Sequence, residues 1–273
     1  MVACILANGM THLTVLLAAA VLHQASVHSP APGAGAVLRA SDFSVRVGQH
    51  IQLSFERQTP TGPVSLAWPH DPVWFFVRLA GTQHNRSAEQ APPSSPHRST
   101  FTPTSPGVAM IGLDLAAADE WWSAEALARY TARAGSSARV RVHRSLTALV
   151  RVLREDGAAV QDHTATSKSG QQAEIRPLMD PTTIPPGGDL PVRVYTLGAG
   201  AGGARLVASH LESGARFEFA ADSKGIASFT ITQPGVWAIE SICVEPPREP
   251  GGDWTAAIAT LSFEVPAEEG ARR

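Results

Sequence analysis

Phe101-Thr-Pro-Thr-Ser-Pro-Gly-Val108 returns further along the chain as Phe229-Thr-Ile-Thr-Gln-Pro-Gly-Val236. In each copy, polar and apolar residues alternate up to a Pro-Gly pair, and a second alternating run follows. Proline fixes φ and glycine accepts a positive φ, so the pair predicts a tight corner between two antiparallel strands. The repeat therefore predicts two similar β-domains in tandem.

The composition fits two folded domains. The chain has 273 residues, of which 44% are hydrophobic and 17% charged, and its formal net charge is −2. This length is sufficient for two domains that each bury a core. A net charge so close to zero gives no overall attraction to nucleic acid, so we expect no nucleic-acid partner.

Residues 1–25 are predicted to be a signal peptide. Leu13–Leu22 is an apolar run, followed by small and polar residues as far as Ser29. The run is too short to span a bilayer, which takes about 20 apolar residues. We therefore expect a periplasmic or secreted protein that does not span a membrane after signal cleavage. A buried core helix is the alternative. Cys243 then remains as the only thiol, and its apolar neighbours predict a buried side chain.

The pattern places domain boundaries at a polar, Gly/Ser/Thr-rich stretch. We expect an N-terminal β-sandwich over residues 37–157, a linker over 158–172, a C-terminal β-sandwich over 173–266 and a tail over 267–273. Apolar residues at helical spacing, with Asp119 or Ser123 as N-cap, predict one helix near 119–135 inside the first sandwich. Seven short alternating runs predict the second sandwich. These runs are Ile175–Leu178, Leu190–Tyr195, Ala204–His210, Ala215–Ala221, Ile226–Thr232, Val236–Val244 and Thr255–Val265.

Several short sequence motifs after residue 173 resemble those of a bacterial family of exported proteins of unassigned function. They are Glu174–Pro181, Pro186–Val194, Asp222–Thr230, Pro234–Trp237, Asp253–Trp254 and Ala259–Val265. Some members of that family are described as accessory components of nickel or cobalt uptake. The resemblance implies an all-β protein of two tandem immunoglobulin-like antiparallel β-sandwiches, in the periplasm, with a membrane transporter component as partner.

One departure from the family bears on metal handling. Many members begin the mature chain with a His-x-x-Trp type of segment that could ligate a metal. Here the corresponding stretch, Ala34–Phe43, contains neither His nor Trp. This weighs against a divalent transition metal as the ligand of this chain.

Gly198-Ala-Gly-Ala-Gly-Gly203 matches the GxGxxG pattern of dinucleotide-binding proteins. Too few residues follow Gly203 for a doubly wound sheet, and the segments that do follow are β-like. We therefore expect a hairpin loop, and a dinucleotide-dependent enzyme is only a remote alternative. No other constellation points to catalysis, so we expect a protein that is not an enzyme.

Histidines offer one metal candidate. None has HxH, HxxxH or HExxH spacing, so no metal site is local in sequence. His84 and His97 bracket a long polar loop and could converge on an ion, although exposed loop histidines are more often simply solvated.

Arginines offer an anion-binding candidate. Arg139 and Arg141 alternate with valines and would project from one strand face, with Arg144 close by; a solvated strand surface is the alternative. Trp121 and Trp122 could stack on sugars or a partner, although such residues more often anchor an element to the core.

From these observations we expect an exported, non-enzymatic binding or accessory protein that assists uptake of nickel, cobalt or another small solute. A structural adhesion or spacer module of the cell envelope is the second hypothesis.

Overall fold

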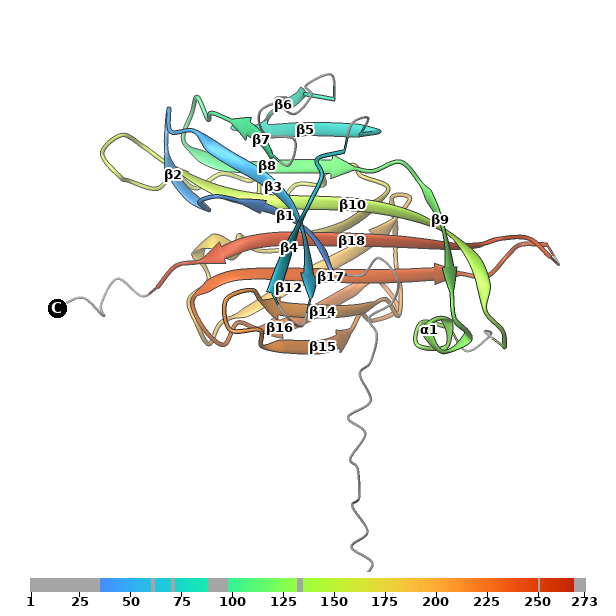
Figure 1. The fold of residues 1–273 in the computed structure, drawn as a ribbon. Coiled ribbons are helices and arrows are strands. Elements are labelled where there is room, and N and C mark those ends of the chain that lie inside the picture. Colours follow the sequence, from blue (N-terminus) through green and yellow to red (C-terminus); the bar gives the residue numbers. More distant parts are fainter. Residues whose placement is uncertain are drawn as a thin grey trace, which may run out of the picture.

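The computed structural model describes residues 35–59, 62–69, 72–87, 98–131, 135–249 and 251–267. The expected signal peptide (1–25), the candidate ligand His97 and residues 268–273 of the expected tail lie outside these ranges. The described chain is mostly β, with several antiparallel sheets in a sandwich-like arrangement (Figure 1).

A ten-stranded sheet runs through the middle of the molecule. Its strands, in spatial order, are β15 (Arg216–Ala220), β14 (Arg205–His210), β17 (Gly235–Glu245), β18 (Trp254–Val265), β10 (Ala138–Leu153), β8 (Gly107–Asp114), β5 (Trp74–Leu79) and β6 (Thr82–Asn85). Two short strands, β2 (Ser44–Arg46) and β9 (Ala118–Trp122), also pair with β10.

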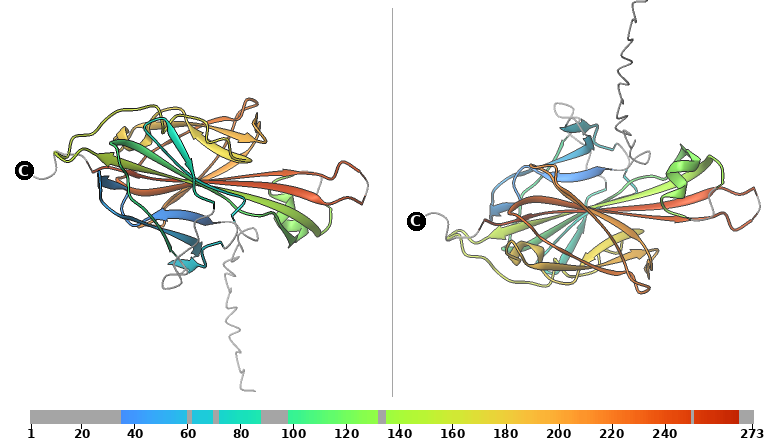
Figure 2. Two further views of the ribbon diagram at one scale, coloured as in Figure 1. Left: turned by 90° about the horizontal axis from the view of Figure 1, so that it is seen from above. Right: turned by 90° about the horizontal axis from the view of Figure 1, so that it is seen from below.

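Two four-stranded sheets cover opposite faces of this central sheet, which gives three layers (Figure 2). The first outer sheet contains β1 (Ala36–Ala40), β3 (Ile51–Thr59), β4 (Gly62–Leu66) and β7 (Arg98–Phe101). The second contains β11 (Ala173–Pro177), β12 (Asp189–Thr196), β13 (Ala199–Gly200) and β16 (Ile226–Thr230), with the 3₁₀ turn Pro181–Thr183 between β11 and β12.

The two halves of the chain repeat one strand order. In the first half β3 pairs with β1, β4 and β7, and in the second half β12 pairs with β11, β13 and β16. The order β6-β5-β8-β10 in the central sheet likewise matches β15-β14-β17-β18. The seven runs expected after residue 173 are therefore strands, and the internal repeat extends to topology.

The expectation of two separate antiparallel sandwiches needs correction. The last strands of the halves, β10 and β18, pair in parallel from Val140↔Trp254 to Ala148↔Ser262 and merge both halves into one sheet. Both faces of these strands are therefore covered, which is why residues 145–150 and 256–263 are buried without alternation.

The Pro-Gly corners also differ from the expectation. They do not join paired strands: β7 and β16 lie in the outer sheets, whereas β8 and β17, which follow the corners, lie in the central sheet. Gly107 has φ 135° and Gly235 has φ 116°, so both corners use the left-handed backbone that glycine permits. A carboxylate accepts the next backbone N–H in each, Asp162 from Val108 and Glu212 from Val236, both at 3.0 Å.

The helix expected near 119–135 is shorter. Residues 118–122 form β9, which pairs with β10, and α1 spans only Ala124–Ala128. The side chain of Ser123 caps α1 by accepting from Ala126 N–H at 3.1 Å. Aromatic residues in Asp-Glu-Trp-Trp favour a strand, so cross-strand pairing prevailed over the helical spacing.

The expected linker, 158–172, is packed against the central sheet. Gln171 is 3% exposed and accepts from Thr147 Oγ1 at 2.7 Å. Its Nε2 donates to Asp114 Oδ1 at 2.8 Å and to the Leu146 carbonyl at 3.2 Å. These bonds fix the connection between the halves.

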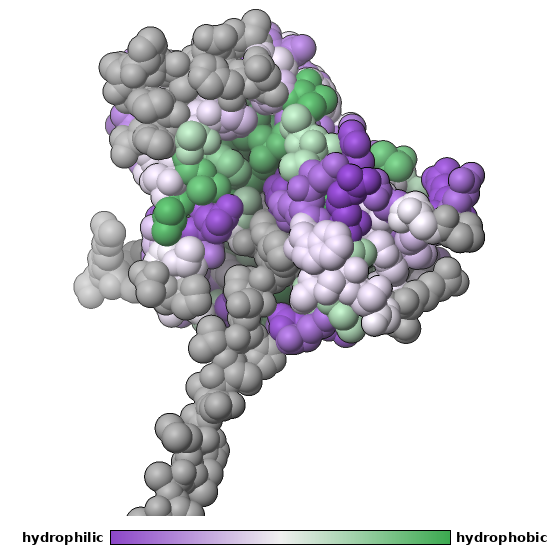
Figure 3. Space-filling view, turned by 45° about the vertical axis from the view of Figure 1, so that its right-hand side comes forward, coloured by the Kyte–Doolittle hydropathy of each residue, from purple (hydrophilic) through white to green (hydrophobic). Residues whose placement is uncertain are grey.

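Two large hydrophobic clusters fill the spaces between the layers. Alternate residues of β5 divide between them: Phe76 faces the second outer sheet, whereas Phe75 and Val77 face the first. On the side shown in Figure 3, polar and hydrophobic residues both reach the surface, and several hydrophobic residues lie in and around a hollow. Among the described residues, no helix has the length and apolar character needed to cross a membrane.

Candidate functional site: a groove at the end of the first half

A solvent-accessible groove with a volume of about 780 Å³ lies between β5–β6 and β7. Its lining is polar around an apolar floor, and none of the lining residues within the described part of the chain is Asp or Glu. The lining residues are His50, Val77, Leu79, Ala80, Thr82, His84, Asn85, Arg86, Thr100, Phe101, Thr102, Thr104 and Ser105.

Two imidazoles lie on this groove. His84 is in β6 opposite Val77, and His50 precedes β3. Thr102 Oγ1 lies 2.7 Å from His50 Nδ1. A hydrogen bond at Nδ1 orients the ring and leaves Nε2 for a ligand, the arrangement that metal-binding histidines use.

Arg86 adds a positive charge held between two rings. Its guanidinium carbon lies 5.7 Å from the Phe75 ring centroid and 5.6 Å from that of Phe101. Its Nη2 donates to the Thr100 carbonyl at 3.1 Å. These contacts hold the guanidinium in place, so the groove combines a fixed cation, two imidazoles and several hydroxyls.

The second half differs from the first beside its Pro-Gly corner. Its Pro-Gly-Val corner is followed by Trp237, whereas the first corner is followed by Ala109. The Trp237 ring lies 5.1 Å from His210, 5.7 Å from Phe229 and 6.0 Å from Phe217. An aromatic cluster therefore packs around Trp237, whereas Ala109 lies fully buried in the hydrophobic core of the first half.

Of the two histidines predicted to bind a metal, the structure describes one. His84 lines the groove, and His97 lies outside the described residues. Within the described ranges, no three His, Cys, Asp or Glu side chains are grouped closely enough to hold an ion. His50 and Arg86 were missed by sequence reasoning because they come from separate segments that only the fold brings to one groove.

The three candidate anion-binding arginines do not converge. Arg139 makes two bonds to Asp253, at 3.0 and 2.9 Å, and Arg144 Nη2 bonds to Glu120 Oε1 at 2.5 Å. Arg139 and Arg141 lie on one face of β10, and Arg144 on the other. Carboxylates neutralise two of the three, which weakens the site for an anion.

The glycine-rich run forms a hairpin loop. Leu197 and Gly198 are the turn between β12 and β13, with φ 48° and 81°, and β14 follows at residue 205. A dinucleotide site needs a helix to begin there, and a strand does instead.

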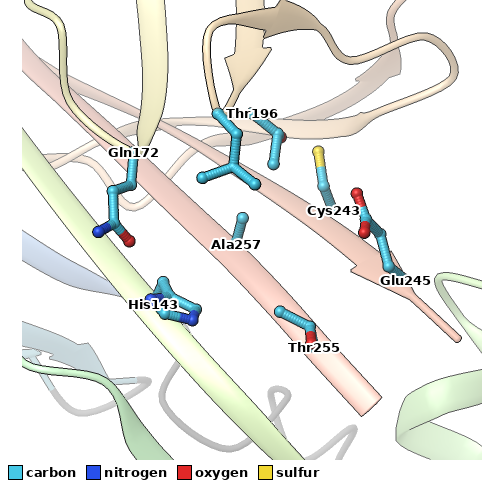
Figure 4. A pocket seen from close by; sticks show the side chains of 8 residues that line it. His143, Gln172, Thr196, Cys243, Glu245, Thr255 and Ala257 are labelled. Atoms are coloured by element: carbon cyan, nitrogen blue, oxygen red, sulfur yellow. The ribbon is translucent and has the colours of Figure 1, made fainter. Parts of the chain in front are cut away.

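A second, smaller cavity of about 60 Å³ lies at the junction of the halves. His143, Ala257 and Cys243 project into it from β10, β18 and β17, with Gln172 and Thr196 across from them (Figure 4). Burial raises the pKa of the Cys243 thiol, so it stays protonated near neutral pH and is a poor nucleophile.

A comparison with known protein families finds a match over most of the chain. A family model described as a domain of unknown function (DUF4198) matches residues 38–244. No curated protein matches the chain.

Solved structures share only weak likeness with the chain. A chain from the complex of the mouse coronavirus receptor-binding domain with its murine receptor is 10% identical, with 85% of this chain and 99% of that chain covered and a TM-score of 0.22. Murine CEACAM1b is 8% identical over 85% and 99%, with a TM-score of 0.21. A Corynebacterium diphtheriae protein is 9% identical over 85% and 59%, with a TM-score of 0.22. Scores this low support no argument about fold or function.

Proposed function

The chain belongs to the family of the domain of unknown function DUF4198, and from this premise we propose that it is an exported, non-enzymatic binding protein that assists uptake of a small solute. The proposal places it in the periplasm or outside the cell, with a membrane transporter component as partner. It also treats each outer sheet, together with the part of the central sheet that it covers, as an immunoglobulin-like sandwich, with the two sandwiches merged through β10 and β18.

The groove on the first half is the observation that carries this proposal. Ligand sites are concave, with an apolar floor and a few fixed polar groups, and this groove has both. A guanidinium and two imidazoles among the described lining residues favour an anionic solute over a bare cation. If the solute contains nickel or cobalt, we propose that the metal arrives bound to an anionic chelator. The two imidazoles would then occupy two coordination positions of the metal, and the chelator would fill the others.

Thermal denaturation of the metal-free protein tests the proposal. Nickel or cobalt chloride, each alone and with excess citrate, is added, and we expect citrate complexes to raise the melting temperature. A ligand that binds only the folded state stabilises it by RT ln(1 + [L]/Kd), which is about 2.7 kcal/mol at a ligand concentration of 100 Kd.

Variants locate the effect. His50→Ala and His84→Ala should abolish the shift, whereas His163→Ala should keep it, because His163 is exposed and lies outside the groove. No shift with either metal, with or without citrate, would favour the spacer hypothesis. An equal shift in the groove variants would place the site elsewhere.

A further inference from the structure

One end of the central sheet projects beyond the outer sheets as an arm (Figures 1 and 2). It consists of β9, the start of β10 and the adjoining ends of β17 and β18. One face of the arm is covered: Trp122, Val140 and Val142 form a hydrophobic cluster with Leu127 of α1. Strand alternation places Asp119, Trp121, Arg139, Arg141 and Asp253 on the opposite side. We name these five residues the open face.

Trp121 distinguishes the open face from an ordinary solvated strand surface. Its side chain is 69% exposed, whereas the neighbouring Trp122 is fully buried. The two tryptophans thus divide between the two sequence hypotheses: Trp122 anchors the arm, and Trp121 is presented to solvent. An exposed indole on a regular strand is a ready stacking surface.

The charges beside Trp121 are balanced, and one oppositely charged pair among them is hydrogen-bonded. Arg139 lies opposite Trp121 in the β9–β10 register and holds Asp253 through two parallel bonds. Arg141 lies opposite Asp119. Two positive and two negative groups therefore surround the indole, which disfavours polyanions such as nucleic acid. Binding to a lipid surface is also disfavoured, because it requires a larger apolar area than one exposed tryptophan side chain provides.

The same face continues into the small cavity at the junction of the halves. Two residues beyond Arg141, His143 lines that cavity together with Glu245 and Thr255. At about 3.3 Å per residue, the path along β10 from the level of Trp121 to His143 is about 13 Å. Hydrogen-bonding groups thus follow the indole over the length of several sugar rings.

We propose that the open face binds a neutral oligosaccharide or polysaccharide. A sugar ring offers an apolar C–H face to the indole of Trp121, and its hydroxyls both donate and accept. The Arg139–Asp253 pair supplies donors and acceptors in one plane, already oriented by their mutual bonds, so little ordering is needed on binding. This site is separate from the groove and does not depend on the function proposed for it.

Native gel electrophoresis through embedded polysaccharide tests the proposal. The probes are laminarin, dextran, xylan and galactomannan, and purified peptidoglycan sacculi are used in a parallel sedimentation assay. We expect at least one probe to retain the protein, and Trp121→Ala to weaken binding by about tenfold or more, since truncation of a central aromatic residue typically has that effect. Trp121→Phe, which keeps a stacking ring, should retain part of the binding.

Two controls separate the outcomes. His163→Ala should bind as the wild type does, because His163 is exposed and lies outside both the groove and the open face. The melting temperature of Trp121→Ala should equal that of the wild type, because the side chain is mostly exposed; if it falls, Trp121→Phe decides. The proposal is overturned if no probe retains the wild type, if Trp121→Ala binds undiminished, or if lipid vesicles alone bind.

Discussion

Replacing Gln171 by alanine should destabilise the whole molecule, because this residue ties the connection between the halves to the central sheet. The change removes three hydrogen bonds and leaves Thr147 Oγ1 and Asp114 Oδ1 without this partner. Both residues are buried, at 6% and 5% exposed. A buried polar group that loses its partner costs about 1–3 kcal/mol, so we expect a loss of about 4 kcal/mol in the free energy of unfolding.

Urea denaturation, followed by tryptophan fluorescence and circular dichroism, measures this loss. Gln172→Ala is the matched control, because the neighbouring side chain is exposed and its loss should change stability by less than about 0.5 kcal/mol. Since the halves share one sheet, wild type and variant should each unfold in a single transition with both probes. A loss below about 1 kcal/mol for Gln171→Ala, or two separate transitions in the wild type, would refute the reasoning.

Three further predictions concern single residues. Gly235→Ala should cost more than about 2 kcal/mol by denaturation, because φ is 116° and the new Cβ would lie 2.5 Å from His210 Nε2; Gly48→Ala, with nothing within 4 Å, should cost about 1 kcal/mol, and equal costs would argue against the close contact. Leu197→Asn should stabilise by about 1 kcal/mol, because Leu197 is 74% exposed at φ 48°, where asparagine is better tolerated; a loss of stability would contradict this. Burial raises the pKa of Asp114 above 3.8, so the folded state binds the carboxyl proton more tightly than the unfolded state does. The contribution of Asp114 to stability therefore falls as pH rises from the unfolded-state pKa through the folded-state pKa. Asp114→Asn should therefore gain stability relative to wild type between pH 3 and 7, and a constant difference across urea titrations would exclude this.

The strands could be predicted from sequence because their signal is local. Period-two alternation and turn residues located seven of the eight described strands after residue 173, and only the two-residue β13 was missed. Alternation does not identify the partner of a strand, however. The corner from β7 to β8 therefore read as a hairpin, although the chain crosses there between sheets.

The merger of the halves could not be read from either half alone. A parallel pair such as β10–β18 joins residues more than a hundred positions apart, and no short-range pattern specifies the register. The sequence indicates this merger only through the mostly apolar residues 145–152, because a strand with one exposed face would alternate polar and apolar residues.

The candidate sites show the same division between local and distant information. His84 was identified because it borders a polar loop, and Trp121 because it stands in a tryptophan pair. His50, Arg86 and the pairing of Arg139 with Asp253 depend on segments that only the fold brings together.

The hydroxyls of β18 fasten the earliest strand of the fold. Thr260 donates to the Ala36 carbonyl at 2.9 Å and Ser262 to the Leu38 carbonyl at 2.5 Å, across 224 positions in each case. During synthesis, β1 must therefore wait for nearly the entire polypeptide to leave the ribosome before these bonds can form. Contacts that join such distant positions slow folding, because the loop between them must close before the bonds are formed.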